Sequence, residues 1–370
     1  MRAIRHRVTI EPLDSFRDDP NEWKRLAQAS RNIFASWEWI STWWEHFGRG
    51  EQLVASRRAT DGTLVALVPL YRATVGPLRL LRFMGHGTGD QLGPIAAQRD
   101  ATLAGETLVQ AVAETRPAWD VFLAEEMPGD APWRLDLRGQ TLNRRGSPVI
   151  RFAEHSSWDD YLETRSRNLR REIRHHERRL MRKYRVRVRT TDDARRLGQD
   201  LDILFGLHAA RWAGTPSSFR RQHRFHRAFA SLALREGWLR LAFLELDGTP
   251  VAARYDFRFG GVHSAYNGGR DPRLARESVG LVLRTRTMRL ALDEGATEYR
   301  FLRGDEPYKY RFADHDPGLE TVAVARGALG IAAVKIVPFV RGSRSVKGLA
   351  RGLLSAGRRR DPTERPPLTA

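Results

Sequence analysis

The sequence contains no cysteine in its 370 residues. Disulfide bonds, zinc–thiolate sites and thiol nucleophiles are therefore excluded, and a reducing compartment is permitted. No apolar run approaches the roughly 20 residues that span a bilayer, since the most apolar late stretch, residues 327–340, contains Lys335 and Pro338. The basic start, residues 1–7, does not lead into the apolar core of a signal peptide. We therefore expect a cytoplasmic protein, with at most peripheral contact at the inner membrane face.

Acidic residues are too few to balance the basic ones. Lys and Arg total 63 against 44 Asp and Glu, which gives a net charge of +19. A field of that sign attracts polyanions such as nucleic acid, anionic lipid and phosphorylated cofactors. The length is sufficient for about two domains, each with a core of its own.

Residues 251–312 contain the pattern around which the chain is organised. Alternation of apolar and polar residues predicts a half-buried strand at 251–259, and a second strand follows at 262–267 after a glycine turn. Ser278 is a suitable N-cap for a helix, which Gly295 ends. A short strand at 299–302 then leads into a polar turn. The predicted order is hairpin, helix, strand and charged loop.

This order predicts a chemical site. A helix that starts just after a strand has unpaired backbone N–H groups, which can hold an anion such as a pyrophosphate. The next strand ends in a loop that contains Asp305, Glu306, Tyr308, Lys309 and Arg311. An anion site beside a loop of acids, bases and phenols is typical of a group-transfer enzyme.

The same order of elements occurs twice in the chain. The turns Asp61-Gly62-Thr63 and Asp247-Gly248-Thr249 occupy matching points of the two halves. We therefore predict an α/β protein with two tandem units, each built on a mixed sheet. The expected domains are residues 1–146, residues 147–320 and a basic amphipathic tail at 321–370 with a disordered end. The polar segment 134–147 is the expected seam, and only the second unit has the reactive loop.

Two basic segments allow alternative interpretations. Residues 158–184 are predicted to form one long helix, whose arginines either dock an anionic partner or form a solvated face that pairs with its own glutamates. The anionic partners considered are a phosphorylated acceptor, an acidic glycan, tRNA and lipid headgroups. The tail either lies on an anionic membrane or packs on the domains.

Three histidines were considered for chemistry. His208 is a possible base, although its position beside Leu207 favours a structural role. His223 and His226 have no carboxylate or cysteine at ligand spacing, so the sequence predicts no metal site.

Several motifs resemble those of one family. The run F-L-R-G-D-E-P-Y-K-Y-R-F at 301–312 resembles the closing motif of the CelD/BcsL-like (cellulose biosynthesis-associated) acyltransferases, a branch of the GNAT superfamily similar in architecture to the Fem-type peptidyl ligases. Other matching pieces are R-N-L-R-R-E-I-R-H-H-E-R-R-L at 167–180, L-H-A-A-R-W at 207–212 and S-W-E-W-I-S-T-W-W-E-H-F-G at 36–48. The resemblance implies two tandem GNAT-like (acyl-CoA N-acyltransferase) units. It also implies transfer of an acyl or acetyl group from acyl-CoA to an amine, in polysaccharide, lipid or envelope metabolism.

The pattern and the resemblance together suggest a set of site residues. The pantetheine arm of acetyl-CoA or another acyl-CoA is expected along the edge of 262–267, although Gly280 is all that remains of the superfamily's Gln/Arg-x-x-Gly-x-Gly/Ala cradle. The expected cofactor-binding residues are Tyr266, Asn267, Arg276, Ser278, Val279, Gly280 and Leu281. The expected substrate-binding residues are Asn168, Arg171, Arg174, Arg211, Trp212, Arg303 and Arg311.

The predicted catalytic roles lie in the charged loop. Asp305 or Glu306 would accept the proton of the amine, Tyr308 would protonate the leaving thiolate, and Lys309 would stabilise the oxyanion. The competing interpretation is an ion-paired turn, in which Arg303 pairs with Asp305 and Glu306 pairs with Lys309. Two other functions stay open. One is a Fem-like ligase that uses aminoacyl-tRNA, and the other is a non-catalytic envelope-assembly protein.

Overall fold

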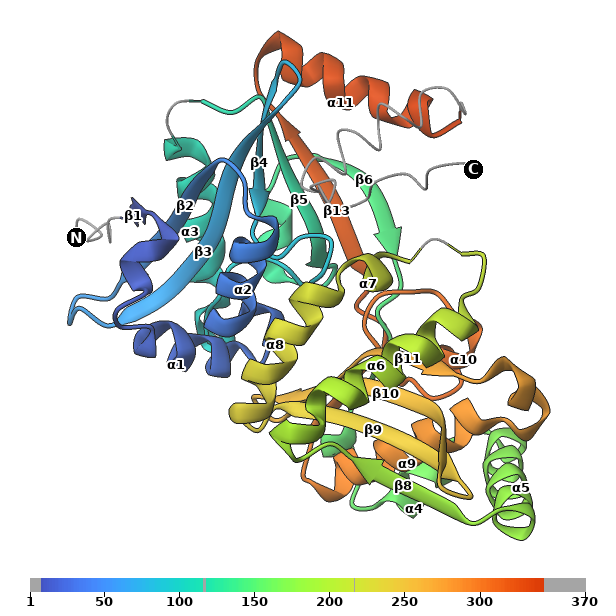
Figure 1. Cartoon of the computed structure of the whole chain (residues 1–370). Coiled ribbons are helices and arrows are strands. Elements are labelled where there is room, and N and C mark those ends of the chain that lie inside the picture. The colour runs from blue at the N-terminus through green and yellow to red at the C-terminus, as the bar shows by residue number, and fades with distance from the viewer. Residues whose placement is uncertain (1–7, 116–117, 216, 343–370) are drawn as a thin grey trace, which may run out of the picture.

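The computed structural model describes residues 8–115, 118–215 and 217–342. It contains two α/β units, each with helices packed on a mixed sheet (Figure 1). The first unit consists of β1 (Val8–Glu11), α1 (Asn21–Ser30), α2 (Trp37–Phe47), β2 (Glu51–Arg58), β3 (Leu64–Val75), β4 (Leu78–Phe83), α3 (Ala101–Glu114) and β5 (Val121–Pro128). The second consists of β8 (Val186–Thr190), α6 (Ala194–Arg211), α7 (Ser218–Arg221), α8 (His223–Arg235), β9 (Leu239–Leu246), β10 (Thr249–Phe259), β11 (Val262–Arg270), α9 (Val279–Asp293) and β12 (Glu298–Arg300).

The two units repeat one topology. The strand orders are β1-β2-β3-β4-β5 and β8-β9-β10-β11-β12. In each series the last pair is parallel, and the earlier pairs are antiparallel. Gly62 and Gly248, in the matching turns, have the same left-handed φ of 85°. These observations confirm the repeat that the sequence predicts.

Three further strands connect the units. The chain passes through β6 (Gln140–Arg145) and β7 (Val149–Ile150) between the units, and through β13 (Leu319–Ala325) after the second. β13 lies between β5 and β6 in the first sheet, whereas β7 joins the second sheet beside β12. The seam predicted at 134–147 therefore contains a strand, and the boundary predicted at 320 divides β13. Pattern along the chain does not show which sheet a strand will join.

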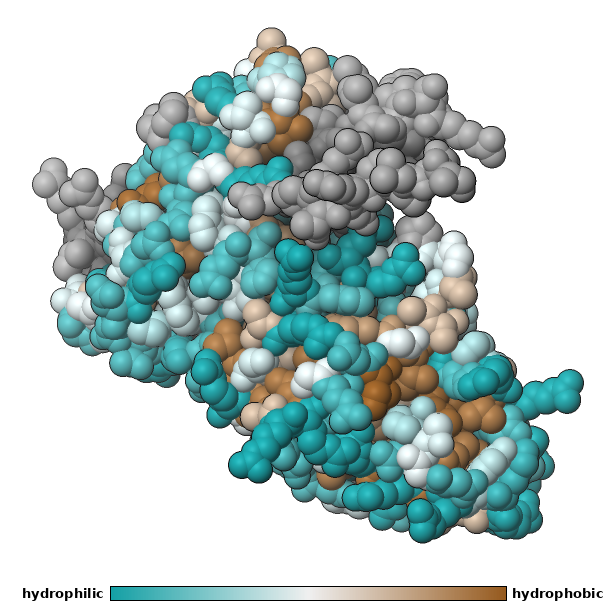
Figure 2. Space-filling view, in the orientation of Figure 1, coloured by the Kyte–Doolittle hydropathy of each residue, from teal (hydrophilic) through white to brown (hydrophobic). Residues whose placement is uncertain are grey.

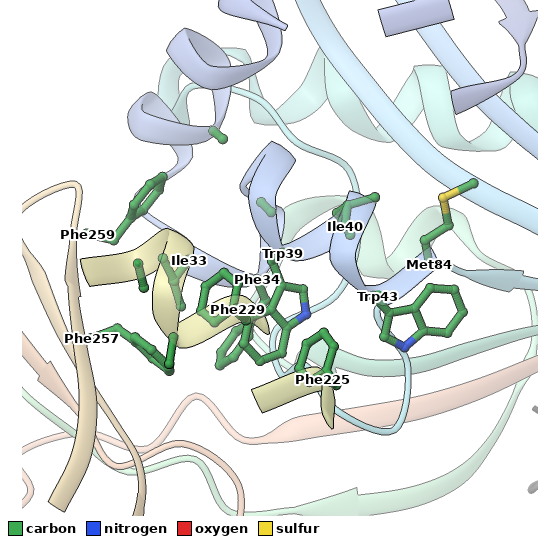
Figure 3. Packing of buried hydrophobic residues seen from close by; sticks show 14 of the residues in the cluster. Ile33, Phe34, Trp39, Ile40, Trp43, Met84, Phe225, Phe229, Phe257 and Phe259 are labelled. Atoms are coloured by element: carbon green, nitrogen blue, oxygen red, sulfur yellow. The ribbon is translucent and has the colours of Figure 1, made fainter. Parts of the chain in front are cut away.

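An aromatic core joins the two units (Figure 3). Ser36 caps α2 by accepting a hydrogen bond from the backbone N–H of Trp39. The Trp39 ring lies 4.6 Å from the ring of Phe229 and 5.0 Å from that of Phe225, both on α8, and 6.3 Å from that of Phe257 on β10. The aromatic face of α2 therefore serves core packing, and it fixes one unit against the other.

The predicted long basic helix is broken. The structure has α4 (Trp158–Glu163) and α5 (Arg167–Lys183), and Ser166 caps α5 through its side chain. α5 buries Leu169, Ile173 and Leu180 toward α9, and its arginine-rich side faces outward. Figure 2 shows mostly hydrophilic side chains at this edge of the molecule.

The C-terminal region packs on the first sheet as far as it is described. The charged loop forms α10 (Pro307–Tyr310), and α11 (Gly327–Gly342) follows β13. Val334 is buried with Leu78 and Leu80, and Gly330 lies against the backbone of Asp120. Of the two predicted roles for the tail, packing on the domains therefore holds for the start of α11, while residues 343–370 lie outside the described residues. In the described ranges, no helix has the length and apolarity to cross a membrane.

Candidate active site

The second sheet opens between β11 and β12. These strands pair only where Val262–Ser264 faces Glu298–Arg300. Beyond Ser264, β11 pairs with β10 alone, so the other edge of residues 265–270 has no strand partner among the described residues. We predicted that pantetheine would pair with the strand edge of residues 262–267. The first three of these residues pair with β12 instead, so the edge is free only from Ala265 onward.

A cavity of about 250 Å³ lies beside this free edge. β10, β11, the start of α9, α10 and the last residue of α6 contribute its walls, so it is formed where the sheet opens. The charged, polar and helix-start residues that line it are Arg211, Arg254, Arg270, Ser278, Gly280, Leu281, Arg284 and Tyr308. Five of these were predicted as site residues, whereas Arg254, Arg270 and Arg284 were not.

The start of α9 differs from the prediction. Ser278 has a left-handed φ of 53°, and its side chain does not cap the helix. The Ser278 hydroxyl oxygen instead lies 3.4 Å from Nε2 of His176. The first amide groups of α9 therefore have no side-chain cap, and they carry the positive end of the helix dipole.

The structure explains why residue 280 is a glycine. A Cβ atom at this position would lie 3.1 Å from Cδ of Arg270, so glycine allows the Arg270 side chain to lie across the helix start. An arginine over uncapped backbone N–H groups fits the phosphates of a CoA-type donor.

Three buried or half-buried guanidinium groups converge deeper in the cavity, and we call Arg211, Arg254 and Arg284 the arginine cluster. Arg254 pairs with Asp256 at 2.9 Å. The Arg284 guanidinium lies 3.7 Å from the ring centre of Tyr308, and its Nε atom is buried with no hydrogen-bond partner. Burial, together with repulsion from Arg254 and Arg211, lowers the pKa of Arg284 to about 10. The cluster therefore holds positive charge that the protein does not fully neutralise.

Two side chains of the charged loop stabilise its conformation through hydrogen bonds to backbone groups. The buried Lys309 Nζ donates to the carbonyl oxygens of Leu302 at 3.2 Å, Arg303 at 2.7 Å and Gly304 at 3.3 Å. Asp305 Oδ1 accepts a 2.6 Å hydrogen bond from the backbone N–H of Gly146. Neither residue lines the cavity.

Glu306 is the other candidate base. Its Oε2 lies 2.9 Å from Nζ of Lys309, which confirms half of the ion-paired turn that the sequence allowed. Burial raises the pKa of Glu306, but the charges of Lys309 and Arg211 outweigh that effect and lower it overall. A lowered pKa weakens a general base. Of the four predicted catalytic residues, Tyr308 alone lines the cavity.

Arg303 forms contacts across the units rather than the predicted pair with Asp305. Its backbone N–H donates to Asp90 Oδ2 at 2.9 Å, and its guanidinium lies 3.3 Å from Asp90 Oδ1. The Tyr266 hydroxyl donates to the carbonyl oxygen of Thr88 at 2.9 Å. The glycine-rich loop of residues 85–90 is thus fixed to the second unit, with Asp90 buried.

The remaining predicted residues are dispersed. Asn267 accepts a hydrogen bond from its neighbour Gly268, and Arg311 pairs with Glu172 at 2.5 Å. Burial lowers the pKa of His208 to about 4, which makes it a poor base near neutral pH. The residues placed outside the walls of the cavity are Asn168, Arg171, Arg174, Trp212, Tyr266, Asn267, Arg276, Val279, Arg303, Asp305, Glu306, Lys309 and Arg311.

The sequence contains only a weak indication that the three arginines not predicted belong to the site. Arg254 lies in the first predicted strand and Arg284 in the predicted helix, whereas Arg270 lies three residues beyond the second predicted strand. An arginine in such an element requires either a carboxylate partner or a ligand.

Comparison with known proteins agrees with this geometry. A family model described as an acetyltransferase (GNAT) domain matches residues 167–310. No curated protein matches the sequence. The match lies in the second unit, and the first unit repeats the strand order of the second. The match supports acyl transfer in general, and GNAT folds commonly use acyl-CoA as co-substrate.

Three solved structures share the fold of most of the chain. FemX has a TM-score of 0.60 at 11% identity, over 86% of this chain and 97% of that chain. The C-terminal domain of a putative lysylphosphatidylglycerol synthetase from Agrobacterium fabrum has a TM-score of 0.55 at 11% identity, over 86% and 95%. A conserved protein of unknown function from Bacteroides thetaiotaomicron has a TM-score of 0.54 at 12% identity, over 87% and 100%. The narrower resemblance to the CelD/BcsL branch stays a prediction.

Proposed function

We propose that this protein is an N-acyltransferase that moves an acyl group from acyl-CoA to the amine of an anionic small molecule or glycan. The observation that carries the proposal is the cavity at the opening between β11 and β12. It combines a free strand edge, an uncapped helix start crossed by Arg270, and a phenol at the end of the adjacent loop.

The donor would be held in an extended form. The free edge of residues 265–270 offers backbone groups to the pantetheine amides, and the start of α9 with Arg270 offers donors to the phosphates. The thioester would then lie near the opening, beside Tyr308. Positioning of the two reactants in this way is itself a large part of catalysis by a transferase.

The chemical step needs one base and one acid. The amine nitrogen attacks the thioester carbonyl, the new C–N bond forms, and the C–S bond breaks. We assign Glu306 to accept the proton of the amine, because its carboxylate is half-exposed and lies two residues before Tyr308, whereas Asp305 is held by the backbone N–H of Gly146. Tyr308 gives a proton to the leaving thiolate and regains it from solvent. Asp305 and Lys309 are assigned to shape the loop.

The acceptor side is proposed from charge. Asn168, Arg171 and Arg174 are exposed on α5, and the two arginines have no carboxylate partner in the described part of the chain. We propose that they attract an anionic acceptor of polysaccharide, lipid or envelope metabolism in the cytoplasm, where residues 343–370 could add peripheral contact with a membrane.

A Fem-like ligase is the second candidate, because the likeness to FemX extends over 86% of this chain. In that case the donor is aminoacyl-tRNA, and the positive charge of the protein serves the RNA backbone.

Isothermal titration of the full chain with acetyl-CoA and with an aminoacyl-tRNA separates these candidates. We expect acetyl-CoA to bind, and Arg270→Met to weaken that binding about tenfold, the loss of one charge-assisted contact. Arg273→Met is the matched control, since Arg273 is exposed, pairs with Asp271 and lies outside the cavity. Binding of the tRNA but not of acetyl-CoA would favour the ligase. Binding of neither would favour a non-catalytic role.

A further inference from the structure

The arginine cluster is more positive than the start of α9 requires. Asp256 is the carboxylate that pairs with Arg254, and it also faces Nε2 of His263 at 3.2 Å. Among the described residues, no carboxylate oxygen lies within 4 Å of Arg211, Arg270 or Arg284. These three guanidinium groups therefore share a cavity of about 250 Å³ and have no ion-pair partner in the described part of the chain.

Burial makes this arrangement costly. An unpaired charge removed from water costs several kcal/mol, and like charges add to that cost. The Arg284 side chain is 9% exposed, its Nε atom has no partner, and the Tyr308 ring covers one face of the guanidinium. Proteins retain such a group where a ligand supplies the missing charge.

The cluster is distinct from the helix start. Arg284 lies in the second turn of α9, roughly 7 Å along the axis from Val279 at 1.5 Å per residue. Helix-dipole effects are confined to the first turn. Two anionic groups are therefore accommodated, one at the start of α9 with Arg270, and one between Arg284 and Arg211.

The position of the cluster indicates which part of a donor it meets. Arg284 on α9 and Arg211 on α6 approach the cavity from elements on opposite sides of the second sheet, at the opening beside β11 and Tyr308. A donor with its phosphates at the start of α9 and its arm along residues 265–270 brings its acyl group to this opening. The cavity of about 250 Å³ has room for a short polar chain.

We infer that the transferred acyl group ends in a carboxylate, which the guanidinium groups of Arg211 and Arg284 bind. This inference rests on the proposed function, and it names the class of donor as a short dicarboxylic acyl-CoA. Arginine matches a carboxylate through paired N–H donors, which a lone ammonium cannot reproduce. Arg254 keeps its ion pair with Asp256, so it contributes positive electrostatic potential to the cavity but does not contact the carboxylate of the acyl group.

The test compares succinyl-CoA, acetyl-CoA and CoA by isothermal titration against the full chain. A charge-assisted hydrogen bond contributes about 1.5–3 kcal/mol, so succinyl-CoA should bind roughly 10- to 100-fold more tightly than acetyl-CoA. Arg284→Met should remove that preference and leave the affinity for acetyl-CoA within about threefold. Arg284→Lys, which keeps charge but loses the paired donors, should retain only part of it.

Arg286→Met is the matched control, because Arg286 lies two residues further on α9, pairs with Glu177 and does not line this cavity. It should leave the preference intact. Circular dichroism and thermal melting verify that each variant is folded. Equal affinity of the unaltered protein for succinyl-CoA and acetyl-CoA would overturn the inference while leaving the proposed function in place.

A second result would also overturn it. If Arg284→Met weakens CoA, acetyl-CoA and succinyl-CoA equally, the cluster serves phosphates common to all three. If none of the three compounds binds, the proposed function fails, and the inference fails with it.

Discussion

The two units share a topology but differ in the arginines at the opening of the sheet. In the first unit, β4 and β5 pair over Leu80–Arg82 and Val121–Leu123, which matches the short pairing of β11 and β12. Arg82 thus takes the place of Ser264, and it is 1% exposed. Its guanidinium lies 2.6 Å from Glu125.

Other arginines of the first unit are paired as well. Arg57 lies 3.0 Å from Glu106, and Arg79 lies 2.8 Å from Asp120. In the second unit, Arg254 at the corresponding opening pairs with Asp256, but Arg211, Arg270 and Arg284 have no ion-pair partner among the described residues. One opening therefore has its arginine paired within the protein, and the other has three arginines that are not.

The largest expected effect concerns where the chemistry occurs. Glu306→Gln should lower turnover by about 10²–10⁴, the usual contribution of a general base, with little change in melting temperature. Asp305→Asn is the matched control, since an asparagine oxygen can still accept the Gly146 N–H. Steady-state kinetics on the acceptor decides this. Unchanged turnover in Glu306→Gln would remove that residue from the mechanism.

The next effect tests the contrast in stability directly. Arg82→Met leaves the Glu125 carboxylate without its buried partner, so the free energy of unfolding should fall by about 3–5 kcal/mol. Arg284→Met removes an uncompensated buried charge, so the free energy of unfolding should stay the same or rise by about 1–4 kcal/mol. Denaturant titrations of both variants provide the comparison. An equal loss in the two would mean that Arg284 has a structural role.

Acid should act mainly on the second unit. Burial holds the pKa of His208 at about 4 in the folded protein, below the ordinary 6.5. The unfolded chain therefore takes up the proton first, so stability is complete above about pH 6.5 and is lost as the pH falls toward 4, by on the order of 3 kcal/mol. Burial lowers the pKa of His226 in the same direction.

Thermal melting between pH 4 and 7 measures this effect. His208→Gln should flatten the dependence, whereas His175→Asn, at an exposed position of α5, should leave it unchanged. A protein equally stable at pH 4.5 and pH 7 would argue against a neutral buried His208.

The smallest effect concerns the exposed face of α5. Arg171→Ala with Arg174→Ala should raise the apparent KM for the acceptor about five- to thirtyfold, at 0.5–1 kcal/mol per exposed arginine, and leave acyl-CoA affinity unchanged. The effect should shrink as salt rises, because the contacts are screened. Arg195→Ala with Arg196→Ala, on exposed positions of α6, makes the same charge change elsewhere. Equal kinetics in both double variants would make the α5 arginines a solvated face.

Local features of the fold were predictable because they depend on near neighbours. The Ser36 cap, the aromatic face of α2 and the two hairpins follow from side chains a few residues apart. The break in the basic helix was missed because the charges continue through residues 164–166, where Ser166 starts a new helix. β10 was expected to be half-buried, but α9 covers its polar face, where Arg254 and Asp256 pair.

The site was less predictable, because it depends on convergence between distant elements. The sequence indicated the anion-binding helix start and Tyr308, but the ion pairs that occupy Asp305, Lys309 and Arg303 link residues far apart or run to backbone groups. No spacing rule brings Arg211 and Arg284, 73 positions apart in the chain, to one cavity.

The placement of β13 has a consequence for folding during synthesis. This strand is made after the whole second unit, yet it lies between β5 and β6 inside the first sheet. During synthesis the first sheet therefore remains open along β5 until more than 300 residues have left the ribosome, and its exposed edge could pair wrongly in the meantime. A chain ending before Leu319 would leave that gap permanently. The last strand thus makes completion of the first unit depend on completion of the second.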